Sequence, residues 1–529
     1  MLTSITLQNF KGIGEEITIP IRPLTIMFGK NSAGKSTVVQ ALHYAREVLL
    51  HNNPNADRTA LGGTSIDLGG FLNIVHNHDL SKPIMLRFEF TVDALPSYNS
   101  FWQDHFLDVL EDSGLSSGDD EYKAAAGARD VISQHQGESF AEEMFREKGR
   151  GDETAATAGV EIIVHWSETL QRAIVTRYLT WLGDDPAGMI TTSLDGASFD
   201  YSINLDNRFF CNEEEPTGPD WISDVLVPLK QSLPNWGQGL EIVPHSDGYD
   251  RMIGTQTVSE MIVAPGDILI ELLSELRYIG PLRETPPRNF QPPNQEDEST
   301  WANGTGAWAR LYKGGDILVG DVGEQLSSSY LKTGYVLVME RFREIPLDSK
   351  LMLALQLGSV LDSIDDTAVE VKKFPIKERL MIVEENSGLK LMPNDIGVGI
   401  SQIVPVVVAA VDSFHKVIAI EQPELHLHPA VQAELGDLLI TSAREHENTF
   451  FIETHSEHLI LRVLRRIRET ENEEDTGNSS KIYPDDVSLV YVEPTSDGTQ
   501  ILSIPITTEG DLEKNVPGGF FAERAKELF

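Results

Sequence analysis

The feature that most restricts the fold of this chain is a glycine-rich segment, Gly29 to Ser36, with the pattern G-x-x-x-x-G-K-[ST]. It follows an apolar run, 24–28, that predicts a buried strand, and it precedes a helix-like run, 36–50. The glycines allow a tight backbone path that directs consecutive N–H groups at phosphate oxygens, and the helix N-terminus adds partial positive charge. This strand–loop–helix unit predicts an α/β protein with a phosphate site.

Within the loop, different residues are expected to have different tasks. Lys35 would reach the β- and γ-phosphates of a nucleotide, the Ser36 hydroxyl would bind Mg²⁺, and Thr37 would support the α-phosphate. ATP and Mg²⁺ are therefore the predicted cofactors, and a chance match at a glycine-rich turn is the alternative. The backbone of the loop is expected to surround the phosphates through Gly29, Lys30, Asn31, Ser32, Ala33 and Gly34.

A second apolar run, 417–420, is followed by acidic residues. Glu421 takes the place from which an acid binds Mg²⁺, directly or through water. Gln422 stands where a glutamate normally polarises the attacking water, and an amide can orient water but cannot accept its proton. We therefore expect slow hydrolysis, or a different base, for which Glu424 and His455 are the candidates. Gln422 is expected to be natural, and an engineered replacement that retains ATP is the alternative.

Several motifs together resemble the heads of ABC-type ATPases. The heads that they resemble are those shared by structural maintenance of chromosomes proteins and overcoming-lysogenization-defect nucleases. The resemblance covers about 1–92 and 276–529. Finer features resemble a subgroup of stand-alone ATPases linked to bacterial anti-phage defence. The segments that carry the resemblance are 5–12, 29–36, 421–429 and 453–458, and for the subgroup 278–284, 394–402 and 517–521.

The resemblance implies that ATP is held between two protomers, each of which supplies a signature loop to the nucleotide of the other. The corresponding loop here is 396–400, in which Gly397 replaces the usual serine, so Ser401 or Asn394 would supply any polar contact. Gly399 opens a helix and can direct N–H groups at a γ-phosphate. A flexible loop before a core helix is the alternative.

The same resemblance implies roles for further residues. His455 would contact the γ-phosphate, Lys11 would approach the nucleotide, and Arg283 would link nucleotide state to the middle of the chain. His426 and His428 would lie at the interface between protomers. A zinc site is not expected there, because two histidines are too few ligands.

Four segments are predicted in an α/β P-loop NTPase with a mixed sheet. The middle segment is expected to be partly helical with an antiparallel meander, and no heptad pattern predicts a long coiled coil. Too few residues follow 493 for a metal-binding Toprim nuclease domain, so a strand pair is expected there. The segments are 1–94 (first half of the ATPase domain), 95–275 (inserted helical and β region), 276–485 (second half of the ATPase domain) and 486–529 (strand pair and tail).

Charge and composition restrict which classes of partner and which cellular compartment are expected. The chain has 82 acidic and 42 basic residues, a net charge of −40, which disfavours nucleic acid as a partner without excluding it. The one dense basic cluster is expected to be a solvated face; it comprises Arg462, Arg465, Arg466 and Arg468. The single cysteine, Cys211, excludes an internal disulfide framework and suits the cytoplasm. The apolar run 403–411 is too short to cross a membrane, and no secretory signal is expected.

These patterns favour an ATP-dependent switch in which two copies, or a higher homo-oligomer, close around ATP. Its partner would be a separate effector, a nuclease or a toxin, within an anti-phage system. The alternatives are a clamp that holds DNA ends between paired heads, and a scaffold that keeps ATP with little turnover.

Overall fold

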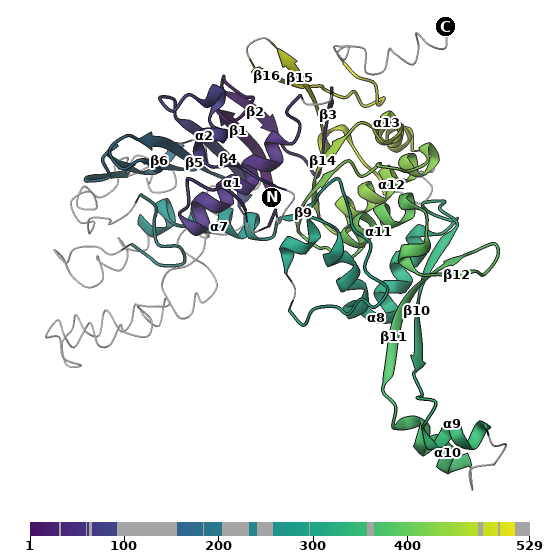
Figure 1. Cartoon of the computed structure of the whole chain (residues 1–529). Helices are drawn as coiled ribbons and strands as arrows, with labels where there is room; N and C mark the ends of the chain where they lie inside the picture. The colour runs from purple at the N-terminus through teal and green to yellow at the C-terminus, as the bar shows by residue number, and fades with distance from the viewer. Residues whose placement is uncertain are drawn as a thin grey trace, which may run out of the picture.

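The computed structural model describes residues 1–30, 33–59, 61–62, 66–92, 156–183, 185–203, 232–240, 258–295, 297–356, 364–473, 480–495 and 498–513. Predictions for Asn31, Ser32, Cys211, the segment 517–521 and most of the segment 95–158 lie outside these residues. Within the described parts of the chain, the strands form three sheets, with helices packed on both sides of the central one (Figure 1).

The central sheet, which we call the nucleotide sheet, has the strand order β16-β15-β3-β14-β13-β9. All of its strands are parallel except β16, which returns antiparallel to β15 and confirms the predicted strand pair. Because neighbouring parallel strands are buried on both faces, they read as continuous apolar runs, which explains why the sequence located them. The strands are β3 (Leu24–Gly29), β9 (Arg277–Ile279), β13 (Val417–Glu421), β14 (Thr449–Thr454), β15 (Val487–Thr495) and β16 (Gly498–Ser503).

The two faces of the nucleotide sheet belong to two different cores. On β14, Phe451 packs into one core together with α1 (Thr37–His51) and α7 (Ala264–Ser274), whereas Phe450 and Ile452 pack into the other. The helices of the second core are α8 (Thr305–Leu326), α11 (Val398–Val411), α12 (Pro429–Glu445) and α13 (Glu457–Glu471). The helix α8, in which Gly315 has φ +63°, was not predicted from the sequence.

A second sheet, antiparallel throughout, joins the N-terminal strands to the predicted meander in the order β2-β1-β4-β5-β6-β7-β8. The proposed division at residue 94 therefore crosses a continuous sheet, because β5 pairs with β4 along its length. The sequence missed β7, whose Gly188 lies against Ile262 so closely that a Cβ would be 2.3 Å from that side chain. The strands are β1 (Leu2–Gln8), β2 (Ile17–Pro20), β4 (Ile84–Val92), β5 (Ala156–Ser167), β6 (Arg172–Leu182), β7 (Asp185–Thr192) and β8 (Phe199–Ile203), and a short helix, α2 (Phe71–Ile74), precedes β4.

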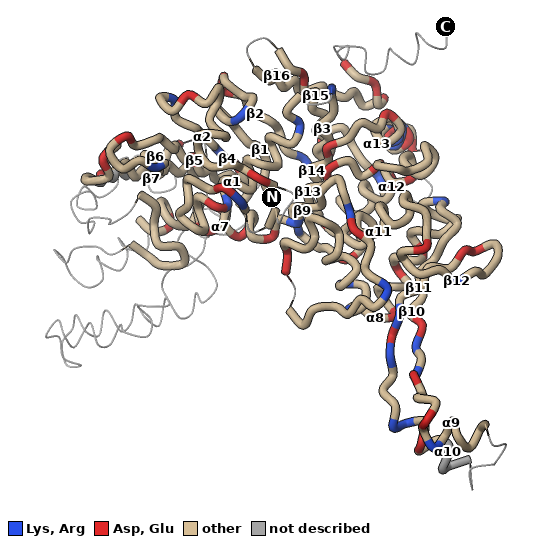
Figure 2. The backbone as a smooth tube through the Cα atoms, viewed as in Figure 1, with Lys and Arg blue, Asp and Glu red and all other residues tan. Residues whose placement is uncertain are grey.

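The third sheet contains a hairpin that projects from the body and ends in two helices (Figure 1). Basic and acidic residues alternate along it (Figure 2), and Arg379 pairs with Glu340 across the strands at 2.8 Å. The elements are β10 (Tyr335–Arg343), α9 (Lys350–Gln356), α10 (Ile364–Lys372), β11 (Ile376–Glu384) and β12 (Lys390–Leu391). Short 3₁₀ turns occur at His76–His78, Glu298–Trp301, Pro393–Asp395 and Pro484–Asp486. None of the helices in the described ranges is long and apolar enough to span a bilayer.

Candidate functional site

The strand order of the nucleotide sheet brings the predicted motifs to one edge. β14 lies between the phosphate-loop strand β3 and the carboxylate strand β13, and all three run parallel. In this register Glu421 is level with Glu453, which is level with Met27. Level residues on parallel strands point to the same face, so the two glutamates lie on the face that α1 covers.

The phosphate loop is held against residues of β15 and β16. Gly29 has φ +147°, and a Cβ there would lie 1.9 Å from the backbone oxygen of Val492. Gly34 has φ +94°, and its Cβ would lie 2.9 Å from the Thr499 hydroxyl, which donates to the Ala33 oxygen at 3.1 Å. Only glycine satisfies both the backbone conformation and the space at these two positions.

The ammonium group of Lys35 is buried at the mouth of the loop. Its Nζ donates to the backbone oxygens of Gly29 at 3.3 Å and of Lys30 at 2.7 Å. Burial lowers the pKa of Lys35, and the negative charges of Glu453 and Glu424 oppose that shift. The ammonium is thus fixed where the loop closes, and phosphate oxygens are the acceptors that could replace the loop carbonyls.

The metal side of the site differs from the prediction in one respect. The acid that touches Ser36 is Glu453, whose Oε2 accepts from the Ser36 hydroxyl at 2.6 Å. Glu421 instead accepts from the Tyr278 hydroxyl at 3.0 Å, and burial together with the charge of Glu453 raises the pKa of Glu421 to about 7. Neither Glu453 nor Tyr278 was predicted. Glu453 could have been found, because it directly follows an apolar run, as Glu421 does.

These groups fit Mg²⁺, which prefers oxygen ligands and is usually held by one or two carboxylates together with substrate phosphates. Two neighbouring carboxylates and a serine hydroxyl supply that donor set. Within the described residues no cluster of three or more His, Cys, Asp or Glu side chains could hold a metal without such phosphates.

The two candidate bases, Glu424 and His455, differ in their hydrogen bonding and charge. Both oxygens of Glu424 are engaged, since Oε2 accepts from the Thr454 hydroxyl at 2.8 Å and Oε1 from the His455 amide at 2.6 Å. Glu424 thus supports the turn that carries His455. Burial and the positive charge of Lys35 lower the pKa of His455, so its imidazole is neutral near pH 7 and able to accept a proton. Gln422 has φ +46°, and its backbone N–H donates to the backbone oxygen of Glu453 at 2.7 Å.

Arg283 connects the carboxylate strand with the helix after the signature loop. Its guanidinium donates to the backbone oxygens of Glu421 at 2.6 Å, Gln422 at 3.3 Å and Gln402 at 3.2 Å. The Gln402 side chain in turn accepts from the Arg283 amide at 3.1 Å. Burial lowers the pKa of Arg283 to about 10, so the group stays charged at neutral pH.

The predicted signature loop forms the start of α11 and packs against the turn after β13. A Cβ on Gly399 would lie 2.6 Å from the His426 backbone oxygen, whereas Gly397 is exposed with free space around it. Ser401 is buried and its hydroxyl donates to the Val398 oxygen at 2.8 Å, so its contact with a partner nucleotide stays a prediction. No hydrogen bond joins this loop to the phosphate loop within the described ranges.

A pocket of about 260 Å³ lies between the signature loop and the turn that contains both predicted interface histidines. His428 caps α12, since its Nδ1 accepts from the Ala430 amide at 3.2 Å. The pocket is lined by Lys332, Thr333, Gly397, Gly399, Ile400, His426, Leu427, His428, Ala430 and Val431.

Lys11 lies in a turn that is attached to the phosphate loop through Thr499. The Thr499 amide donates to the Gly12 oxygen at 2.6 Å, and the His76 ring hydrogen-bonds the Lys11 oxygen at 2.9 Å. Burial lowers the pKa of Lys11, with Asp67 opposing the shift. The turn is therefore next to the site, while contact of the Lys11 ammonium with nucleotide stays a prediction.

The predicted basic cluster on α13 is neutralised by acids. Arg466 is buried and pairs with Asp437 at 2.7 Å and with Glu469 at 2.5 Å. Arg462 also pairs with Asp437, Arg465 with Glu469, and the exposed Arg468 lies 3.5 Å from Asp511. Such a surface gives phosphate backbones little unpaired positive charge.

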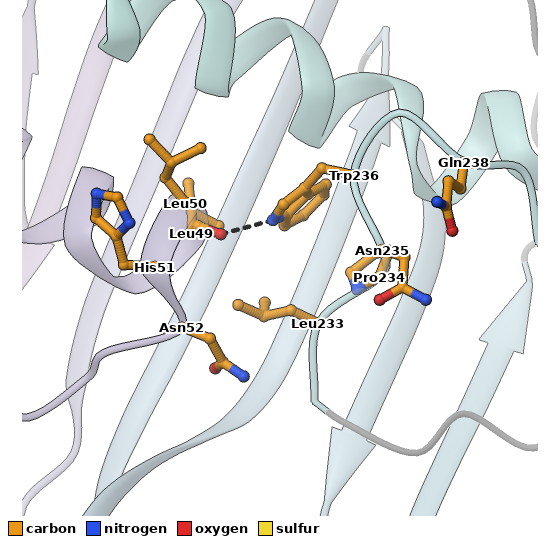
Figure 3. Close-up of a pocket in the computed structure, with 9 residues that line it drawn as sticks. All are labelled: Leu49, Leu50, His51, Asn52, Leu233, Pro234, Asn235, Trp236 and Gln238. Carbon is orange, nitrogen blue, oxygen red and sulfur yellow. Dashed lines mark hydrogen bonds between the residues drawn. The ribbon is translucent and has the colours of Figure 1, made fainter.

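A second pocket, of about 480 Å³, lies at the opposite end of α1 from the phosphate loop (Figure 3). The Trp236 indole spans it and donates to the Leu49 oxygen at 2.6 Å. The remaining lining residues are Leu50, His51, Asn52, Leu233, Pro234, Asn235 and Gln238. It is separate from the nucleotide site.

Comparison with known proteins defines the class of the chain. The model of the AAA ATPase domain family matches residues 1–156 and 342–460, just over half of the chain, and the protein therefore belongs to this family. That match and the sheet described above confirm the predicted α/β P-loop NTPase fold. A search of curated proteins found no match.

Among solved structures, the chain is similar to three heads of structural maintenance of chromosomes proteins. One is an SmcHead bound to the C-winged helix domain of ScpA (10% identity, TM-score 0.38, covering 95% of this chain and 97% of that one). Another is the SMC head domain from Thermotoga maritima (9% identity, TM-score 0.35, covering 96% and 99%). The third is an Smc head with an extended coiled coil bound to the C-terminal domain of ScpA derived from Pyrococcus furiosus (10% identity, TM-score 0.35, covering 100% and 98%). Similarity at these scores bears neither on function nor on partners.

Proposed function

We propose that the protein is an ATPase that binds ATP with Mg²⁺ at the phosphate loop and hydrolyses it slowly. The observation that carries this proposal is the convergence of Lys35, Ser36, Glu421 and Glu453 at one edge of the nucleotide sheet. Bound Mg²⁺ would neutralise phosphate charge. The loop amides and Lys35 would hold the phosphates, Ser36 and Glu421 would supply oxygen ligands, and Glu453 lies beside them as the hydrogen-bond acceptor of Ser36.

Slow turnover follows from the groups near the attacking water. The Gln422 amide orients water without taking its proton, and both oxygens of Glu424 are occupied. His455 remains as the group whose neutral imidazole can accept the proton. A general base contributes roughly 10²–10⁴ in rate, so its replacement by an amide removes much of the acceleration.

We further propose that ATP closes two copies of the protein. The N-terminus of α11, which begins at Val398 and includes Gly399 in its first turn, would bind the γ-phosphate held by the second copy. This contact would exist only in the closed pair. ATP then shifts the population toward the closed form, because it binds that form more tightly. Arg283 would transmit the shift, since it joins α11 to the end of β13. The closed pair would control a separate effector, a nuclease or a toxin, in an anti-phage system.

The decisive experiment measures ATP affinity by calorimetry and particle mass by light scattering, with and without ATP. Lys35→Ala should abolish binding and any ATP-dependent doubling of mass. Lys82→Ala is the matched control, because Lys82 is exposed and lies outside the phosphate loop. Unchanged ATP affinity in Lys35→Ala would refute the site, and tight binding without a change of mass would refute only the closure of two copies.

A scaffold that retains ATP with little turnover is the second candidate, and Gln422 favours it. The third, a clamp on DNA ends, is disfavoured by the paired arginines of α13. Salt-dependent DNA binding by the purified protein, lost on substitution of the exposed Arg468, would favour the clamp.

A further inference from the structure

Among the described residues, the serine of the phosphate loop and the acid of the carboxylate strand form hydrogen bonds with different partners. The Ser36 hydroxyl donates to Glu453 at 2.6 Å, and Glu453 belongs to β14, the strand between β3 and β13. Glu453 therefore lies one strand closer to the phosphate loop than Glu421 does. Glu453 is buried, with 6% of the residue exposed, and Ser36 is half-buried, so the contact is partly shielded from bulk water.

Glu421 is held from the other side. Its Oε1 accepts from the hydroxyl of Tyr278, which lies on β9, the strand beyond β13. Glu421 is thus hydrogen-bonded to a tyrosine on β9, whereas Glu453 is hydrogen-bonded to Ser36 on the opposite side, next to β3. The two acids lie level on neighbouring strands but are oriented by different partners.

The chemistry of a serine ligand explains why the second acid matters. A hydroxyl that binds a cation does so through an oxygen lone pair, and its proton must point away toward an acceptor. Glu453 is that acceptor in this structure, and an ionised acceptor gives the stronger hydrogen bond. Its negative charge also lies next to the position that the cation would occupy.

We propose that Glu453 is the positioning residue for the metal side of the nucleotide site. It accepts the proton of the Ser36 hydroxyl, so that an oxygen lone pair of Ser36 faces the position that Mg²⁺ would occupy. This inference rests on the proposed function, since it concerns the same nucleotide. The competing role is a purely electrostatic partner for the nearby Lys35 ammonium, in which case Glu453 would matter equally with and without metal.

The test is calorimetric binding of ADP in EDTA and in Mg²⁺, which involves no turnover. Glu453→Gln should reduce the gain in affinity that Mg²⁺ gives by about tenfold, as expected for one charge-assisted hydrogen bond, and leave the affinity in EDTA unchanged. Ser36→Ala should lose the same gain. The double variant should be no worse than either single one, because both remove one interaction.

Two further variants sharpen the result. Glu453→Asp keeps the charge and should restore most of the gain, whereas Glu457→Gln, the same chemical change at the start of α13, should have no effect. If Glu453→Gln does not fold, Ser36→Ala still tests the inference, because a full Mg²⁺ gain without the hydroxyl through which Glu453 acts would overturn it.

The inference is overturned by a full Mg²⁺ gain in Glu453→Gln or in Ser36→Ala, by additive losses in the double variant, or by an equal loss in EDTA. A wild-type protein that binds no ADP in either condition would refute the proposed function itself. One that binds ADP normally while the Glu453→Gln variant keeps its Mg²⁺ gain would refute only the role of Glu453.

Discussion

Acidification should destabilise this protein through a histidine buried behind the nucleotide site. His43 lies on α1, the helix that follows the phosphate loop, and its ring packs edge-on against Tyr278 at 5.1 Å between centroids. The only hydrogen bond of the ring among the described residues joins Nδ1 to the Thr59 hydroxyl at 3.2 Å. Burial and the nearby charge of Arg46 lower the pKa of His43 to about 3.

The size of the effect follows from the difference between the folded and unfolded states. Below about pH 6.5 the unfolded chain takes up a proton at His43, whereas the folded chain does not until about pH 3. The unfolded state then binds more protons, so the contribution of His43 to stability is present above pH 6.5 and is lost as the pH falls. At about pH 5 the solution is about 1.5 pH units below the pKa of His43 in the unfolded chain, and the unfolded state is therefore favoured by roughly 2 kcal/mol.

The assay compares urea unfolding of the wild type and His43→Asn at about pH 7.5 and pH 5. The wild type should lose roughly 2 kcal/mol more than the variant between these conditions, because all other titrating groups are shared and cancel. His51→Asn, at the exposed end of the same helix, is the control. An equal loss of stability in wild type and His43→Asn would show that the buried ring does not resist protonation, and the reasoning would fail.

Three further results are expected. Gly399→Ala should lower thermal stability by about 1–3 kcal/mol, because its Cβ would lie 2.6 Å from a backbone oxygen, while Gly397→Ala, with nothing near its Cβ, should be nearly neutral. Gln422→Glu should raise steady-state ATP turnover about a hundredfold by supplying a general base, and no increase would favour the ATP-bound scaffold. Arg466→Met should cost about 3 kcal/mol in chemical denaturation because it leaves buried carboxylates with less compensation, whereas Arg468→Met, at an exposed pair, should change stability by less than about 0.5 kcal/mol.

Local patterns determined the elements of the ATPase core. The strand before Gly29, the helix after Ser36 and the strand that ends at Glu421 are short-range features, because buried parallel strands are apolar runs and a phosphate loop has a fixed spacing. The same reasoning failed for β7 and α8. In β7, Gly188 packs so closely against Ile262 that a Cβ would lie 2.3 Å from that side chain, and a contact with a residue 74 positions away leaves no local pattern.

The partners within the site were decided only by the tertiary structure. The sequence places Glu421 after one strand and Glu453 after another, but it does not state which strand lies beside the phosphate loop. Because the strand order is β3-β14-β13, Ser36 forms its hydrogen bond with Glu453 on β14, and Glu421 on β13 forms one with Tyr278. Hydrogen bonds between residues hundreds of positions apart depend on strand order and register, and no local pattern encodes these.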